Sequence, residues 1–311
     1  MRIETAPDLQ RDARSVLTTG TFDGVHRGHQ EILRYLVRRA NEVDGVPTVV
    51  SFDPHPREVL GGGRIPLLTT LDERAELLAD LGIERFVVLP FTRDLSLLEP
   101  EAYIEDVLIG QVGLREIVIG YDHRFGKGRA GDRSTLERVG AQHGFSVDVI
   151  PAHIQAGQTV SSSRIRRQLE DEGAASEAAH LLGRPYVLAG TVIAGDQRGR
   201  TLGFPTANVQ LEDARKLVPR VGVYAVQVEL ATGGHYDGMM NVGVRPTFEA
   251  EGAVTVEVHL FDFDQDLYGR TVRVAVLERL RDELKFGGVD ALVAQLHEDR
   301  RQAERVLAGL V

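Results

Sequence analysis

The stretch GTFDGVHRGHQ, residues 20–30, decides the fold of the first half of this chain. It follows a short apolar run rich in β-branched residues, VLTT (16–19), and leads into a segment whose apolar positions repeat at helical spacing. Gly20 and Gly24 would let the backbone approach a ligand closely. A helix start after such a turn offers free N–H groups and a positive dipole end to phosphate, so we predict a nucleotide-binding junction.

Two histidines strengthen this prediction. His26 and His29 lie three residues apart on the turn, with Gly28 between them, and both can donate to phosphate oxygens. Either histidine alone is more typical of a helix cap or a surface position. Zinc binding is a weaker alternative, because no third ligand is evident beyond Asp23 or His55.

The first half alternates strand and helix patterns. Apolar runs rich in β-branched residues lie at 16–19, 48–52, 85–91, 116–120 and 146–151. Amphipathic helices lie between several of them; one begins with a capping box at Thr70 and Glu73 and ends at Gly82. This alternation predicts a Rossmann-like α/β domain, with a parallel sheet and helices on its faces.

Four unusual segments each follow a predicted strand in this half. The first is the 20–30 stretch, and the others are DPHP (53–56), GYDHRFG (120–126) and SSSRIRR (161–167). Ligands bind beyond the carboxyl ends of the strands in open parallel sheets, so we expect these segments to meet at one edge. Hydroxyls and arginines at a helix start suit a triphosphate, although a serine cap followed by a solvated basic face is the plainer alternative.

The pattern changes near residue 184. Strands separated by glycine-rich turns follow, with no helices between them, and predict an antiparallel barrel or sandwich. A closing helix is expected from about 289 to 310, with Leu292, Leu296 and Val306 among its apolar positions. We therefore expect two domains, residues 1–184 and 185–311.

A second phosphate-type loop, GRTLGFPTAN, occupies residues 199–208. An extended backbone would place Thr206 and Asn208 on one face, where they could ligate Mg²⁺ and position phosphate. Gly199 and Gly203 would allow the loop to close over a nucleotide. It is not a Walker A loop, because the GK(S/T) ending is absent. The alternative is a glycine-rich turn into an edge strand.

The stretch VTVEVHLF (254–261) alternates cleanly between two faces. The apolar face, expected to be the core, has Val254, Val256, Val258 and Leu260. The polar face has Thr255, Glu257 and His259. Such a face is usually solvated, and Glu257 could be catalytic only if it lay near Asn208.

Composition narrows the function classes. The 311 residues are 42% apolar and 26% charged, and the net charge of −10 disfavours a general binder of nucleic acid or anionic membrane. The absence of cysteine excludes disulfides and thiolate chemistry. No apolar stretch approaches a membrane span and no signal peptide is evident, so we expect a cytoplasmic protein.

FDGVHRGH and SSSRIR together resemble the nucleotidyltransferase superfamily with an HxGH motif. With SFDPHP, LLTTLDERAELLADLGIERFVVLPF and the RFG loop, the first half resembles the FAD synthetase module of bacterial bifunctional riboflavin kinase/FAD synthetases. The resemblance implies AMP transfer from ATP to FMN, with His29 catalytic. It places around ATP the residues Gly20, Phe22, Asp23, His26, His29, Ser162 and Arg166, and near the flavin Pro54, Pro56 and Asp122. His123 departs from the family, which usually has Phe there, and leaves the flavin contacts of this loop open.

NVGVRPTF (241–248), DLYG (266–269) and LRDELKF (280–286), together with GFPTAN and VEVHLF, resemble the flavokinase module. The resemblance implies a six-stranded Greek-key barrel with a C-terminal helix. It places Gly199, Thr206 and Asn208 at Mg–ATP, with Thr206 and Asn208 as metal ligands, and makes Asn208 and Glu257 catalytic, Glu257 as general base. Arg281, Glu283 and Phe286 would lie near the isoalloxazine, although strand-to-helix packing would also explain them.

The whole chain therefore predicts a bifunctional enzyme that uses Mg²⁺ in both steps. ATP and riboflavin would give FMN and ADP, and ATP and FMN would then give FAD and pyrophosphate. Its partners would be these small molecules, without nucleic acid or membrane, and a homo-oligomer is left open. One rival is a nucleotidyltransferase for a pantetheine or nicotinamide nucleotide, fused to a separate kinase. Another is a flavin-binding or sensory protein with decayed sites.

Overall fold

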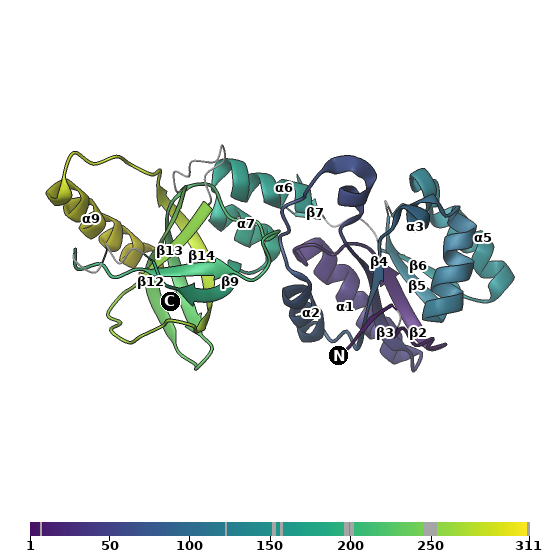
Figure 1. Ribbon diagram of the computed structural model, residues 1–311. Helices are drawn as coiled ribbons and strands as arrows, with labels where there is room; N and C mark the ends of the chain where they lie inside the picture. Colours follow the sequence, from purple (N-terminus) through teal and green to yellow (C-terminus); the bar gives the residue numbers. More distant parts are fainter. Residues whose placement is uncertain are drawn as a thin grey trace. The chain divides into compact units, whose positions relative to one another are not determined.

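The computed structural model describes residues 1–6, 8–121, 123–150, 154–155, 158–195, 199, 202–244 and 254–309 (Figure 1). Asp122 therefore lies outside the described residues. The contacts divide the chain into two compact units, Met1–Ser162 and Ser163–Val311. This division falls ahead of residue 184, because three short helices in between pack with the second unit.

The first unit is built on a parallel sheet of six strands in the order β1-β4-β3-β2-β5-β6 (Figure 1). The strands are β1 (Arg2–Thr5), β2 (Ser15–Thr19), β3 (Val46–Asp53), β4 (Arg85–Pro90), β5 (Leu114–Gly120) and β6 (Ser146–Ile150). The five predicted strands are confirmed. The edge strand β1 is an addition that the sequence analysis missed.

Helices cover both faces of this sheet, because the strand residues that point to either face are apolar. Val16, Val49 and Phe86 pack with α1 (Arg27–Glu42) and α2 (Leu71–Asp80). The residues that follow them, Leu17, Val50 and Val87, pack with η2 (Tyr103–Val112) and α5 (Arg133–His143) on the other side. Shorter turns are η1 (Glu58–Gly62), α3 (Arg93–Leu97), α4 (Pro100–Ala102) and η3 (Lys127–Arg129). The predicted capping box of α2 is present, with Thr70 and Glu73 satisfying each other's backbone N–H.

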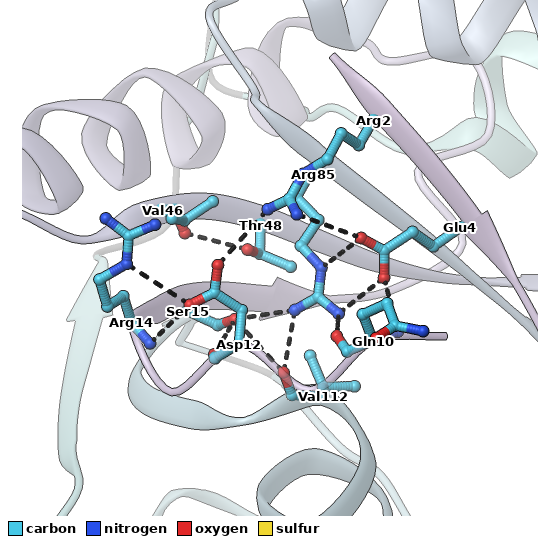
Figure 2. A network of polar contacts seen from close by, with 10 residues as sticks. All are labelled: Arg2, Glu4, Gln10, Asp12, Arg14, Ser15, Val46, Thr48, Arg85 and Val112. Atoms are coloured by element: carbon cyan, nitrogen blue, oxygen red, sulfur yellow. Dashed lines mark hydrogen bonds and ion pairs between the residues drawn. The ribbon is translucent and has the colours of Figure 1, made fainter. Parts of the chain in front are cut away.

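A buried arginine ties the amino-terminal segment to the sheet (Figure 2). Arg85 is fully buried at the start of β4 and donates to both carboxylate oxygens of Glu4, at 3.1 and 2.8 Å. It also donates to Ser15 Oγ and to the Val112 carbonyl, both at 2.9 Å, and to the Gln10 carbonyl. Burial alone would raise the pKa of Glu4, but hydrogen bonds from Arg85 and the Gln10 N–H hold that pKa below its ordinary value. The charge of the guanidinium is thereby compensated inside the protein.

The second unit is a closed barrel of six antiparallel strands, in the order β10-β13-β12-β11-β14-β9. The strands are β9 (Tyr186–Ile193), β10 (Ala207–Leu211), β11 (Gly222–Leu230), β12 (His235–Val244), β13 (Val254–Leu260) and β14 (Thr271–Arg281). Three consecutive strands, β11 to β13, form a meander, and β10 lies beside β13. This is the Greek-key arrangement that the resemblance implies. A separate short pair, β7 (Ile154–Gln155) and β8 (Gln158–Thr159), precedes this unit.

Helices pack on the outside of the barrel. The segments α6 (Ser162–Arg167), η4 (Gln168–Glu172) and α7 (Ala175–Leu182) come first, and Arg220 donates from its backbone N to Leu169 O at 2.8 Å and from Nη1 to Asp171 O at 2.9 Å. The closing helix α9 (Val289–Ala308) contacts β11, β12 and β14. Its buried residues Ala303 and Leu307 join an apolar cluster with Phe204 and Met239.

Two expectations for the 254–261 stretch are wrong. Val254 was expected in the core but is 52% exposed, because it begins the strand at the barrel rim. His259 was expected on the solvated face but is buried, and its Nδ1 donates to the Pro205 carbonyl at 2.8 Å. The ring contacts Phe204, beside the apolar cluster under α9, and burial lowers the pKa of His259.

Candidate active sites

Three predicted loops leave neighbouring strands of the first unit. The segments that begin at Gly20, Asp53 and Gly120 follow β2, β3 and β5, which are adjacent and parallel. Their carboxyl ends therefore meet at one edge of the sheet. Ser162 Oγ donates to the Asp23 carbonyl at 2.8 Å and brings the start of α6 to the first loop.

The loop after β2 has an unusual backbone. Phe22 and Val25 have φ values of 48° and 38°, and Gly24 has φ 83°. A positive φ at a β-branched residue is a genuine outlier, and such strain persists only where the surroundings fix it. Gln30 Nε2 donates to Val25 O at 2.9 Å, and the Phe22 ring is buried. The loop is thus held in a shape that its own sequence would not favour.

Asp23 helps to fix the conformation of the loop after β2. Its fully buried carboxylate accepts hydrogen bonds from the backbone N–H groups of Leu68 and Thr69, at 3.1 and 2.9 Å, and from Thr69 Oγ1 at 3.2 Å. Arg74 Nη2 lies 3.9 Å away. The side chain that was predicted at ATP therefore faces the protein, where it fixes the loop against the segment before α2.

The two histidines stack on each other at the start of α1. His26 caps the helix by accepting from the His29 backbone N–H at 3.3 Å, and the ring centroids are 3.6 Å apart. Burial, followed by the proximity of His26 and Arg74, lowers the pKa of His29 well below its ordinary value. His29 Nδ1 is buried without a hydrogen-bond partner among the described residues. His29 is therefore a neutral imidazole at pH 7.

Two of the predicted flavin-side residues of the first unit, Pro54 and Pro56, follow β3, and the third, Asp122, lies outside the described residues. Pro54 is exposed and follows a cis peptide bond, Pro56 is half-buried, and His55 Nδ1 between them accepts from the Arg57 N–H at 3.2 Å. In the RFG loop, the His123 and Phe125 rings stack with their centroids 5.8 Å apart.

Arg166 lies on α6 and belongs to the second unit. It is buried, with 8% of its surface exposed. Its predicted contact with ATP stays a prediction.

In the barrel, Asn208 on β10 and Glu257 on β13 are direct cross-strand partners. Side chains that oppose each other in this way lie about 5 Å apart at Cβ and on the same face. Thr206 Oγ1 donates to Glu257 Oε2 at 3.4 Å. The structure thus brings together the three residues that were predicted for phosphate transfer.

Glycines let the backbone lie against these side chains. A Cβ at Gly195 would stand 1.9 Å from Asn208 Nδ2, so a larger residue there would displace the Asn208 carboxamide. A Cβ at Gly199 would stand 2.2 Å from the Phe204 carbonyl and 3.4 Å from Thr206 Oγ1. The sequence analysis missed Gly195, because a glycine at the end of a strand is typical of an ordinary turn.

The predicted flavin end of the barrel is organised by α9. Arg281 donates from Nε and Nη2 to the carboxylate of Asp299, at 2.8 and 2.7 Å, and lies over the Phe286 ring at 5.9 Å. Asp299 is fully buried and was missed in the sequence, since an acidic residue in a helix is usually solvated. Glu283 Oε1 lies against Gly243 on β12.

In the described part of the chain, no three His, Asp or Glu side chains cluster as metal ligands, so the zinc alternative gains no support there. No described helix is long and apolar enough to cross a membrane.

Comparison with known proteins identifies two family modules in this chain. Residues 8–164 match the FAD synthetase family model and residues 182–307 match the riboflavin kinase model. A bifunctional riboflavin kinase/FMN adenylyltransferase from Listeria monocytogenes is 37% identical over 97% of this chain and 96% of its own. The chain belongs to this family. Members from Escherichia coli K12 and Bacillus subtilis are 37% and 36% identical, over 93% and 97% of this chain and 91% and 95% of theirs.

A solved structure is similar to this chain over almost its whole length. It is described as a macrolide-efflux protein from Streptococcus pneumoniae, with a TM-score of 0.88, 32% identity, and coverage of 97% of this chain and 98% of that one. As in the family, the FAD synthetase domain comes first and the flavokinase domain second.

Proposed function

We propose that the barrel phosphorylates riboflavin to FMN and that the first unit adenylylates FMN to FAD, each with ATP. The observation that carries the proposal is the cross-strand pairing of Asn208 with Glu257, with Thr206 Oγ1 3.4 Å from the Glu257 carboxylate. A general base beside phosphate-positioning groups is what hydroxyl phosphorylation requires.

In the kinase step, Glu257 accepts the proton of the riboflavin 5′-hydroxyl as that oxygen attacks the γ-phosphorus. The new O–P bond forms while the bond to the β-phosphate oxygen breaks, and ADP leaves. Thr206 and Asn208 supply hydroxyl and carboxamide oxygens, which are hard ligands that suit Mg²⁺. Two protein ligands fit an ion that takes most of its remaining ligands from phosphate and water. The ion would neutralise charge on the transferring phosphate.

In the adenylyl step, an FMN phosphate oxygen attacks the α-phosphorus of ATP and pyrophosphate leaves. The phosphate is already anionic, so no dedicated base is needed. His26, His29 and the N-terminus of α1 would stabilise the departing charge, together with Ser162 and Arg166. Asp23 serves indirectly, because it fixes the loop that presents these groups. Pro54, Pro56 and Asp122 would line the flavin side.

We also propose that the two modules meet near residue 184, where the riboflavin kinase match begins at residue 182. The net charge of −10 supports small-molecule partners rather than a nucleic-acid or anionic-membrane partner, and we keep the cytoplasmic location as part of the proposal. A homo-oligomer is compatible with either reaction.

Incubation of the purified chain with riboflavin, ATP and Mg²⁺, followed by chromatographic separation of the flavins, tests the proposal. We expect FMN and then FAD, and FAD alone when FMN is supplied. Formation of neither product would overturn the proposal. Transfer of AMP to a pantetheine or nicotinamide nucleotide but not to FMN would favour the rival nucleotidyltransferase. Repetition with a chelator in place of Mg²⁺ should stop both steps.

A further inference from the structure

One row of side chains crosses the outer face of the barrel. Successive cross-strand partners are Asn208 on β10, Glu257 on β13, Asn241 on β12, Val223 on β11 and Arg281 on β14. Residues that oppose each other directly in a sheet share a face. The row therefore runs from the proposed phosphate-transfer residues to the proposed flavin end.

Asn241 is the polar member of the row between these two ends. Its strand neighbours Met240 and Val242 are fully buried, so the Asn241 carboxamide lies on the opposite, outward face, as Glu257 does. Neighbouring strands are about 4.8 Å apart. Asn241 thus stands about 5 Å from the strand of Glu257 and about 10 Å from that of Arg281.

The surroundings of Asn241 are polar and open. A Cβ at Gly243, two residues along the same face, would stand 3.1 Å from Asn241 Nδ2, 3.1 Å from Glu283 Oε1 and 3.6 Å from Thr255 Oγ1. Three polar groups therefore surround a position that has no side chain. The carboxamide of Asn241 makes no hydrogen bond to any described residue, so its donors and acceptor are available to a ligand.

We propose that Asn241 binds one of the secondary hydroxyl groups of the ribityl chain of riboflavin. The inference rests on the proposed kinase function. When the 5′-hydroxyl lies at Glu257 and the ring system lies toward Arg281, the ribityl chain passes over β12. There Asn241 offers one acceptor and two donors to a polyol. Asn241 is thereby a specificity-determining residue, because a site that hydrogen-bonds a hydroxyl rejects an analogue that lacks it.

The test uses the full chain and four substrates, namely riboflavin and its 2′-, 3′- and 4′-deoxy analogues. It measures kcat/KM for formation of the 5′-phosphate of each. We expect Asn241→Ala to lower kcat/KM for riboflavin about tenfold, the effect of one lost hydrogen bond. For the analogue that lacks the bound hydroxyl, the wild-type chain is already slow and the substitution should cause no further loss. Asn41→Ala, at an exposed position on α1, is the matched control and should retain the wild-type values with all four substrates.

Equal proportional loss with all four substrates, or unchanged kinetics, would overturn the inference. Asn241→Ser is the second variant, because it keeps a donor and an acceptor in a smaller side chain. This variant should retain part of the preference for riboflavin over the analogue that lacks the bound hydroxyl. If the variant had wild-type rates but no such preference, the inference would again be overturned. A wild-type chain that forms no FMN would instead refute the proposed function, so the two failures are distinguishable.

Discussion

The Arg281 guanidinium and the Asp299 carboxylate form a bidentate ion pair, with N–O distances of 2.8 and 2.7 Å. Gln295 donates to the same carboxylate at 2.9 Å, and Arg281 Nη1 donates to the Asp282 carbonyl at 2.8 Å. The guanidinium is thus engaged in joining β14 to α9.

Replacement of Asp299 with Ala should destabilise the barrel by about 3–5 kcal/mol, because it leaves a largely buried guanidinium without its carboxylate partner. Urea unfolding of the full chain, followed through the barrel transition, checks this. Asp290→Ala, at an exposed position in the first turn of α9, is the control and should lower the midpoint only slightly, through the lost interaction with the helix dipole. An unchanged midpoint for Asp299→Ala would mean that the pair contributes nothing.

Glu257→Gln should lower riboflavin phosphorylation by about 10²–10⁴-fold, since it removes the base but keeps the shape. Asn208→Ala should also abolish FMN formation. Both variants should convert FMN to FAD at the wild-type rate. Separate assays with riboflavin and with FMN measure this, and Glu229→Gln, exposed on β11, serves as control. Wild-type FMN formation by Glu257→Gln would exclude Glu257 as the base.

His29→Ala should have the opposite effect, with slow conversion of FMN to FAD and normal formation of FMN. The same two assays apply, and His235→Ala, at an exposed position on β12, is the control. Parallel loss of both activities in the His29 variant would show that the two sites are not independent.

The pH dependence of stability should also reveal His29. Its pKa is lowered from 6.5 in the folded protein, so below pH 6.5 the unfolded chain takes up a proton that the folded chain does not. The contribution to stability is complete above that pH and is lost as the pH falls toward the folded pKa. As the pH is lowered from about 7.5 to 5.5, the free energy of unfolding should therefore fall less steeply in His29→Asn than in the wild-type chain. Identical slopes would argue against a buried neutral His29.

Much of the fold was predictable because its elements are locally encoded. The strands β2 to β6 and the α2 capping box carry clear periodic or capping signals. The edge strand β1 has only four residues, of which one is buried, and it pairs with β4 about 80 residues later in the chain. A strand this short shows no periodic pattern, so the sequence did not predict it.

The sequence could propose residues for the candidate sites but could not show how those residues are arranged in space. Asn208 and Glu257 could each be recognised in its strand, yet their pairing depends on a register between strands that are distant in sequence. The same limit applies to Asp23. Its partners at Leu68 and Thr69 are 45 and 46 residues away, so the sequence could not show that its carboxylate holds the loop.

A fragment of residues 163–311 should be more stable than one of residues 185–311. The shorter fragment loses the hydrogen bonds between Arg220 and the carbonyls of Leu169 and Asp171, and it uncovers apolar surface beneath α7. Thermal unfolding of both fragments, with riboflavin kinase assays, checks this. Equal melting temperatures would favour a self-sufficient domain that begins near residue 185.

The Arg85 network has a consequence for the order in which the chain folds during synthesis. Glu4 leaves the ribosome early, but its partner Arg85 follows 81 residues later. The first strand therefore cannot dock on β4 until about half of the first unit, Met1–Ser162, has been translated, and until then its carboxylate remains in water. Because domains generally fold as units and β5 and β6 are made later still, the closing of this ion pair would accompany the assembly of the whole sheet rather than precede it.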